Sequence, residues 1–385
     1  MSADKNEKPL VSICLTFFSA EKFIHRVFDS CLNQTYKNIE VIVVDNASVD
    51  NTGSVIKEYA ARDPRIKYFR NAEKIHLTEC LRKMFELAQG RFVMMIGADD
   101  WLAQDFVENG MRSFTQHPDS AGIVPKVLNF NEIESDRFEF DCVTRLPAPG
   151  VYKPEWLVKR MYRGLQLYIS AYALARREDM LSTIDFFIKN LCKNPLMPED
   201  LRELFWGSYG TDPMFLEVLS RYKTFVYDDS LVFLKVGQPG NIVRDFKYNS
   251  VYEIFRSANY MMLSYSPLYE MKWPKFYRGL KIFSASEVLS TIFLNFFKYG
   301  MHPSFFDISK SRKKVSEFFS YFSFLEIVAG ITGSVPRIAY RVFDAVRRKL
   351  SKTRKFSKGD RDVDMSMVWT QKNFLDKKGF FRVYQ

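Results

Sequence analysis

The sequence lacks most of the features that assign a cofactor or a compartment directly. It has only five cysteines, and no two of them form a CxxC pair: Cys14, Cys31, Cys80, Cys142 and Cys192. Scattered cysteines fit neither a zinc site nor a disulfide framework, and they are typical of a reducing compartment. The first ten residues, MSADKNEKPL, contain no apolar signal core. We therefore expect a cytoplasmic protein.

Long apolar runs and the common nucleotide fingerprints are also missing. No apolar run reaches about 20 residues, so no membrane-spanning helix is expected. The nearest run, FSFLEIVAGITGSV, is short and contains Glu326. The absence of GxGxxG argues against a nicotinamide or flavin site, and the absence of GxxxxGK[ST] argues against a P-loop NTPase. No zinc-finger, RRM or helix-turn-helix signature occurs, so we do not expect nucleic acid as a partner.

What the chain does have is a globular composition with an uneven charge. It has 385 residues, of which 47% are hydrophobic and 26% charged, enough for two domains or one domain with an appendage. The net charge is +11. Residues 267–385 hold 23 Lys and Arg against 10 Asp and Glu, whereas residues 1–266 hold 33 against 35. The basic excess of the last third predicts a polyanionic partner surface.

Apolar strands and amphipathic helices alternate through the first third of the chain. This alternation predicts an α/β fold with a mostly parallel, Rossmann-like sheet and helices on its faces. Strands are predicted at 10–17, 39–44, 65–69, 91–97 and 121–127. Residues 127–150 have a loop-like sequence. Beyond them we expect helices at 152–165, 176–192 and 211–222, a strand at 168–175, a strand pair at 223–236, a mainly helical region at 250–350 and a polar tail.

Acidic residues follow two of the apolar strands. Asp45 comes directly after VIVV, and Asp99 and Asp100 come after VMMIGA. The carboxyl ends of parallel strands face one crevice of the sheet. A hard divalent cation between such carboxylates and a diphosphate would offset their repulsion. The alternative is that Asp99 and Asp100 only cap a helix at about 103–116.

Four stretches in order, LTFFSA, QTY, NIEVIVVDNASVDNT and AQGRFVMMIGADD, resemble the motifs of family 2 glycosyltransferases. Residues 10–127 look like the nucleotide-binding half of that family, which has the GT-A fold. The resemblance implies that a nucleotide-sugar contacts Thr16, Phe18, Asp45, Asn46, His76 and Asp99, and that Asp100 binds Mn²⁺ or Mg²⁺. Asn46 stands where the family usually has an acidic residue, and Gly97 stands where it often has an aspartate. For His76 the alternative is an exposed histidine at a helix start.

The second half resembles the family more weakly. TDPMFLEVLSRY stands where members carry a catalytic base at a helix start, which makes Asp212 the candidate base. Asp212 is also well placed as an N-cap, with Pro213 as the first helical residue. Glu199 and Asp200 are rival candidates. Gln238 replaces a histidine that many relatives use near the diphosphate.

The resemblance implies an inverting enzyme that moves one sugar from a nucleoside-diphosphate sugar, UDP- or dTDP-linked, to a hydroxyl of a glycan or lipid-linked acceptor in cell-surface polysaccharide biosynthesis. No QxxRW motif of processive synthases occurs. The alternative is a non-catalytic nucleotide-sugar or glycan-binding module that retains the fold. We divide the chain into a nucleotide-sugar half (1–127), an acceptor and base half (128–249), a basic helical region (250–350) and a polar tail (351–385).

The basic last third predicts peripheral attachment to an anionic membrane surface, on its cytoplasmic face. Two stretches place apolar residues at helical spacing beside Lys and Arg, as an interfacial helix requires. The alternative is that these stripes pack on the catalytic domain or form a homo-oligomer interface. The apolar positions are Phe276, Leu280, Phe283, Val288 and Ile292 in one stretch, and Ile338, Val342, Phe343, Val346 and Leu350 in the other.

Overall fold

The computed structural model describes two compact units, which are treated separately below. One comprises residues 1–154, 167–237 and 364–385, and the other comprises residues 155–166 and 238–363. Within them the described residues are 8–134, 137–141, 148–154, 156, 172–189, 193, 217–219, 221–237, 278, 281–282, 285–286, 288–290, 292–293, 312, 315–316, 319–320 and 322–352.

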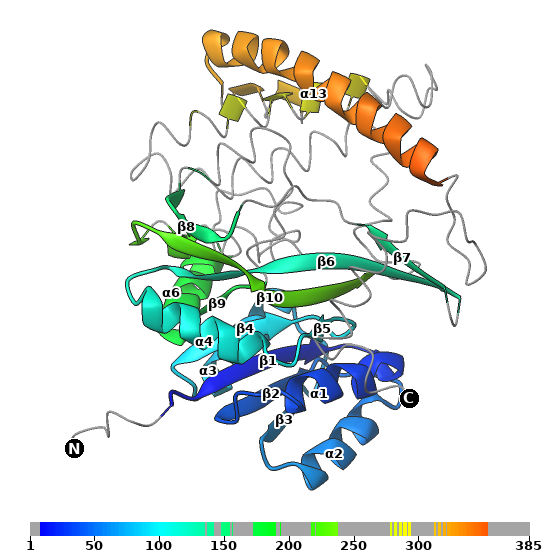
Figure 1. The fold of residues 1–385 in the computed structure, drawn as a ribbon, viewed down its shortest axis with the longest axis vertical. Helices are drawn as coiled ribbons and strands as arrows, with labels where there is room; N and C mark the ends of the chain where they lie inside the picture. Colours follow the sequence, from blue (N-terminus) through cyan, green and yellow to red (C-terminus); the bar gives the residue numbers. More distant parts are fainter. Residues whose placement is uncertain are drawn as a thin grey trace. The chain divides into compact units, whose positions relative to one another are not determined.

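The first unit is built on one mixed ten-stranded sheet (Figure 1). Its order is β3-β2-β1-β4-β9-β6-β10-β5, with β7 on β6 and β8 on β10. The first four strands of this order run parallel, whereas β9 is antiparallel to both its neighbours. The strands are β1 Val11–Phe17, β2 Ile39–Asp45, β3 Ile66–Arg70, β4 Phe92–Ile96, β5 Trp101–Leu102, β6 Gly122–Glu134, β7 Arg137–Asp141, β8 Gly150–Tyr152, β9 Leu174–Arg176 and β10 Phe225–Gly237.

Helices connect the parallel strands, as the alternating pattern predicted. The α/β fold class is confirmed, and the sheet is parallel where the motifs lie and mixed beyond them. Among the described residues of this unit, the helices with defined bounds are the 3-10 helix η1 Glu21–Phe23, α1 Ile24–Leu32, α2 Thr52–Arg62, α3 Leu77–Leu87, α4 Phe106–Gln116 and α6 Arg177–Phe187.

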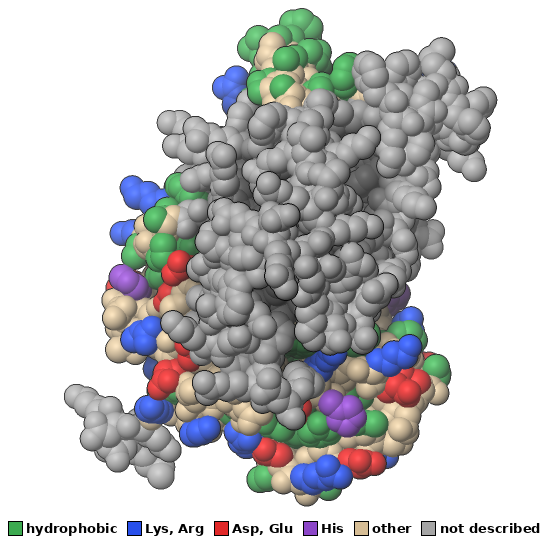
Figure 2. Space-filling view, turned by 45° about the vertical axis from the view of Figure 1, so that its right-hand side comes forward, with side chains coloured by type: hydrophobic (Ala, Val, Ile, Leu, Met, Phe, Trp, Pro, Cys, Tyr) green, Lys and Arg blue, Asp and Glu red, His purple; other side chains and the backbone are tan. Residues whose placement is uncertain are grey.

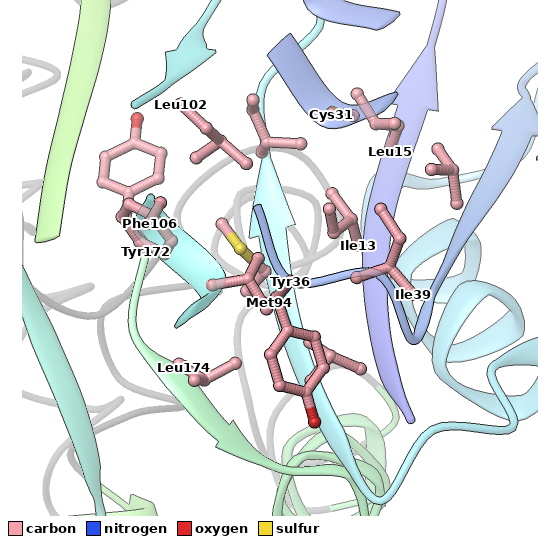
Figure 3. Close-up of a cluster of buried hydrophobic side chains, with 14 of the residues drawn as sticks. Ile13, Leu15, Cys31, Tyr36, Ile39, Met94, Leu102, Phe106, Tyr172 and Leu174 are labelled. Atoms are coloured by element: carbon pink, nitrogen blue, oxygen red, sulfur yellow. The ribbon is translucent and has the colours of Figure 1, made fainter. Parts of the chain in front are cut away.

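The core lies on the central strands. All residues of β2 and β4 are buried, because central parallel strands are covered on both faces and therefore have continuous apolar sequences. Ile13 and Leu15 from β1 and Met94 from β4 form a cluster with Leu102 and Phe106 (Figure 3). This packing holds the carboxyl ends of β1, β2 and β4 in place.

Two predictions about the second half were wrong. Residues 127–134 are not loop, because β6 continues through them and pairs with β7. Residues 225–237 form one strand rather than a pair. The pairing of β10 with β6 shifts register between Asp228 and Val232. The polar YDDS stretch, whose composition is typical of a turn, lies at this bulge. Asp228 stabilises this bulge by accepting hydrogen bonds from the Ser230 amide (2.9 Å) and the Ser113 hydroxyl.

The second unit is described in part. Its described positions between 278 and 293 are helical, and α13 Phe324–Lys352 is a long helix with Pro336 inside it. Of the helices that the structure describes, none combines the length and apolarity that crossing a bilayer requires. Most of the helix predicted at 152–165 lies outside the described residues.

Candidate functional site

The loops that follow β1, β2 and β4 meet at one edge of the sheet. β1 lies between β2 and β4 and runs parallel to both. Phe17 is paired with Asp45, and Leu15 is paired with Ile96. The carboxyl ends of adjacent parallel strands form the usual ligand crevice of an open α/β sheet. The predicted nucleotide and metal residues lie on this edge.

Asp45 is completely buried where β2 ends. Its Oδ1 accepts a hydrogen bond from the Ser48 amide (2.8 Å). Its Oδ2 accepts from the Tyr68 hydroxyl (3.1 Å) and forms an ion pair with Arg70 Nη1 (2.5 Å). Arg70 also donates from Nη2 to the Ser48 carbonyl (2.8 Å). Asp45 therefore anchors the loop after β2 from inside the protein, and its contact with a nucleotide stays a prediction.

Arg70, like Lys74, is a residue of this edge that sequence reasoning missed. It lies at the end of β3, directly opposite Asp45 in the parallel register. Hydrogen bonds to Tyr68 and Asp45 and the Asp45 charge raise the pKa of Arg70, so it stays charged at any physiological pH. Burial and the Asp45 carboxylate raise the pKa of Tyr68, so its hydroxyl stays a donor. The sequence signal for this pair is an arginine at the end of one strand and an aspartate at the end of the neighbouring strand.

Asn46 is also buried, and its amide faces the chain rather than solvent. Nδ2 donates to the Ile75 carbonyl (2.8 Å). Oδ1 accepts from the Ile75 amide (3.0 Å) and from Asn71 Nδ2 (2.9 Å). Asn71 in turn accepts from Lys83 Nζ (2.7 Å). The residue predicted to contact the base therefore holds the loop between β3 and α3, and it uses both the donor and the acceptor that distinguish an amide from a carboxylate.

The loop held by Asn46 places a cation on an exposed aromatic ring. Lys74 Nζ lies 3.8 Å from the centroid of Phe18, and Phe18 is 44% exposed. His76 is exposed and precedes the first residue of α3. Thr16 is half-buried within β1. An exposed ring with adjacent positive charge is suited to a nucleotide, because the ring stacks on a flat base and the cation attracts phosphate.

The loops after β1 and β2 are interlocked by hydrogen bonds. The Ser19 amide donates to Ser48 Oγ (2.9 Å), and the Ala20 amide donates to Thr52 Oγ1 (2.9 Å). Ser19 and Ala47 have positive φ values of 50° and 61°, which non-glycine residues rarely adopt. Such strained residues persist where the surrounding bonds dictate the conformation, and they concentrate at ligand sites.

Asp99 and Asp100 turn their carboxylates toward the same point. A Cβ atom built on Gly97 would lie 2.5 Å from Asp100 Oδ2 and 3.2 Å from Asp99 Oδ1. A side chain at position 97 would therefore push the Asp100 carboxylate aside. The helix-cap alternative was wrong, because β5 intervenes and α4 begins at Phe106 with Asp105 as its N-cap.

The two carboxylates fit a divalent cation. Carboxylate oxygens are the ligands that Mg²⁺ and Mn²⁺ prefer, and Mg²⁺ commonly combines one or two carboxylates with substrate phosphates and water. In the part of the chain that the structure describes, no group of three or more His, Cys, Asp or Glu side chains forms a metal site. Asp99 and Asp100 would thus hold a metal only together with oxygens of a bound diphosphate and water.

The predicted acceptor-side residues lie outside the described residues: Asp212, its rivals Glu199 and Asp200, and Gln238. The assignment of the catalytic base therefore stays a prediction from the resemblance.

Residues 12–178 match the family described as glycosyl transferase family 2. This part of the chain belongs to glycosyltransferase family 2. Glycosyltransferase GlyA of Streptococcus pneumoniae is 30% identical over 47% of this chain and 26% of its own length. The putative teichuronic acid biosynthesis glycosyltransferase TuaG of Bacillus subtilis is 33% identical over 27% of this chain and 41% of its own. The chain therefore spans less than half the length of these relatives.

The fold extends the likeness beyond the family 2 region. Residues 1–349 of Staphylococcus aureus TarS, solved in complex with UDP-GlcNAc, superpose with a TM-score of 0.58. The alignment covers 86% of this chain and 89% of that one, at 13% sequence identity. Likeness at this identity shows that the GT-A architecture is shared.

Replacing Asn46 by Ala should detach the loop after β3. Removal of the amide leaves its hydrogen-bond partners on half-buried Ile75 and buried Asn71 unsatisfied, which costs about 1–3 kcal/mol of unfolding free energy. Urea unfolding measures this loss. Asn51→Ala is the matched control, because Asn51 is exposed at the start of α2 and makes no side-chain cap hydrogen bond. Equal midpoints for the two variants would contradict the role of Asn46.

Proposed function

We propose that this chain is an inverting glycosyltransferase that moves a single sugar from a UDP- or dTDP-linked donor to a hydroxyl of a glycan or lipid-linked acceptor, in cell-surface polysaccharide biosynthesis. The observation that carries the proposal is the common edge of β1, β2 and β4. An exposed Phe18 with Lys74 above it follows one strand, and the paired carboxylates of Asp99 and Asp100 follow another. The family 2 match and the relative TuaG support the reaction class and the polysaccharide role.

Different described residues would bind different parts of the donor. Phe18 would stack on the base or ribose, and Lys74 would place positive charge beside the diphosphate. Asn46 donates to the Ile75 carbonyl, and the Ser48 and Thr52 hydroxyls accept from the Ser19 and Ala20 amides. These hydrogen bonds keep the loops in place before a ligand arrives. Asp100 and Asp99 would hold Mn²⁺ or Mg²⁺, which when bound neutralises the charge of a departing diphosphate.

The proposed transfer is one displacement. The acceptor hydroxyl oxygen attacks the anomeric carbon as the bond to the diphosphate breaks, and Asp212 accepts the hydroxyl proton. Attack from the face opposite the leaving group inverts the anomeric centre. Asp212 enters this scheme from the resemblance of TDPMFLEVLSRY to the family pattern.

Turnover of nucleotide-sugars tests the function itself. Incubation with UDP-GlcNAc, UDP-glucose or dTDP-glucose and Mn²⁺ should release nucleoside diphosphate slowly, and an extract of lipid-linked glycans should accelerate the release. Coupled detection of free UDP or dTDP measures both rates. Saturable binding of a nucleotide-sugar with no release under either condition would instead establish the non-catalytic binding module.

The metal site is tested by Asp100→Asn. This change keeps the shape of the side chain and removes the charge that a cation requires, so turnover should fall by about 10²-fold or more. Steady-state rates with and without Mn²⁺ measure the effect. Asp119→Asn is the control, because Asp119 is exposed in the turn between α4 and the start of β6. Full activity of Asp100→Asn, or of the wild type in excess EDTA, would refute the assignment.

The catalytic base is tested by three isosteric variants. Asp212→Asn should bind donor with unchanged affinity and lose transfer by about 10²- to 10⁴-fold, because general-base catalysis acts on the acceptor and not on donor binding. Donor affinity from calorimetry and transfer rates separate these effects. Wild-type transfer by Asp212→Asn, together with an inactive Glu199→Gln or Asp200→Asn, would move the role to the MPED stretch.

A further inference from the structure

The first half of α13 exposes five large apolar residues. Phe324 is 78% exposed, Ile331 51% and Val335 65%, and Leu325 and Val328 are exposed as well. Phe324, Val328, Ile331 and Val335 follow one another at helical spacing and so lie in one stripe. Figure 2 shows hydrophobic side chains gathered on the surface of this helix, at the top of the view. We call these five residues the α13 stripe.

The opposite face of the same helix is buried and consists of small and polar residues. Glu326, Gly330 and Ser334 are all buried and lie four residues apart. A Cβ atom on Gly330 would lie 2.6 Å from Ala285 Cβ, so the glycine lets the two helices approach closely. The Ser286 hydroxyl donates to the Gly330 carbonyl (3.0 Å).

An ion pair fixes this orientation at the start of the helix. Lys281 Nζ lies 2.9 Å from Glu326 Oε2, and the same oxygen accepts a hydrogen bond from the Ser323 amide (2.8 Å). Rotating α13 to bury its apolar stripe would break this pair and force the small face into solvent. The helix therefore has the reverse of the usual arrangement in a water-soluble domain, where the apolar stripe faces the core.

The charge of the surrounding sequence indicates which surface covers the stripe. After Val335, α13 contains Arg337, Arg341, Arg347, Arg348, Lys349 and Lys352, against Asp344 alone. Residues 267–385 as a whole carry a balance of +13, from 23 basic and 10 acidic residues. A second copy of this chain would bring two such regions together and repel itself. An anionic bilayer offers an apolar phase and the opposite charge at once.

We propose that the α13 stripe docks on an anionic lipid surface, with its apolar side chains at the acyl boundary and the basic half of the helix against the headgroups. This places membrane contact on residues other than those predicted from the sequence. Of the first predicted set, Val288 is buried and Ile292 is half-buried. Ile338 of the second set is half-buried, and the other side chains of both sets lie outside the described ones.

Docking on lipid goes beyond sugar transfer and is independent of it. A protein without transferase activity would still bind vesicles, and an active enzyme that ignores vesicles would refute only the docking. The two proposals therefore fail separately.

Vesicle co-sedimentation of the full chain tests the docking. The wild type should pellet with vesicles of phosphatidylcholine and phosphatidylglycerol at low salt, release as salt rises, and stay in solution with pure phosphatidylcholine. The double variant Val328→Asp with Ile331→Asp should reduce the bound fraction at least tenfold. Val49→Asp is the matched control, because Val49 is 89% exposed in the other unit and should leave binding unchanged.

Three further tests keep the result unambiguous. Thermal melting of each variant shows whether the fold is retained, and Arg347→Gln with Arg348→Gln should weaken binding without touching the stripe. Sedimentation velocity without lipid reports self-association. Three results would overturn the proposal: equal pelleting with neutral and anionic vesicles, vesicle binding unchanged by the double variant, or a wild-type dimer that the double variant dissociates while neither protein binds vesicles.

Discussion

The carboxylate of Asp45, at the end of β2, is buried away from water. The positions of the neighbouring residues depend on the partners that neutralise its charge. Asp45 is completely buried, and Arg70 on the adjacent strand supplies the opposite charge at 2.5 Å. An unpaired buried charge is strongly destabilising, so the fold depends on Arg70 as long as Asp45 is present. The same pair fixes the backbone of Ser48, because Asp45 accepts from its amide and Arg70 donates to its carbonyl.

Ser48 in turn fixes residues at the surface where a donor would bind. The Ser48 hydroxyl holds the amide of Ser19, next to Phe18. Asn46, adjacent to Asp45, holds Ile75, next to Lys74. Phe18 and Lys74 therefore meet because two buried side chains fix the loops that carry them. A nucleotide binding there would meet a surface already formed, and little ordering entropy would oppose binding.

The sequence predicted the strand ends well because they follow from local patterns. VIVVD and VMMIGADD show buried strands that stop on carboxylates, and parallel topology brings such ends together. The partners of those side chains lie 25 to 29 residues away, as Arg70 does from Asp45 and Ile75 from Asn46, and no local pattern contains them. Helical spacing likewise grouped the apolar residues of the last third, but it did not show which face of the helix is buried. The close approach of Gly330 to Ala285 determines that face.

The central claim is that the edge formed by β1, β2 and β4 binds the nucleotide of a donor sugar. Calorimetric titration of the wild type and of Phe18→Ala with UDP, UDP-GlcNAc and dTDP-glucose, each with Mn²⁺ and with EDTA, tests it most directly. The account predicts saturable binding of at least one of these nucleotides that requires Mn²⁺ and weakens about tenfold or more in Phe18→Ala, since base stacking on an aromatic ring contributes about 1–3 kcal/mol. Binding of equal strength in Phe18→Ala, or no binding of any of these nucleotides by the folded wild type, would contradict it.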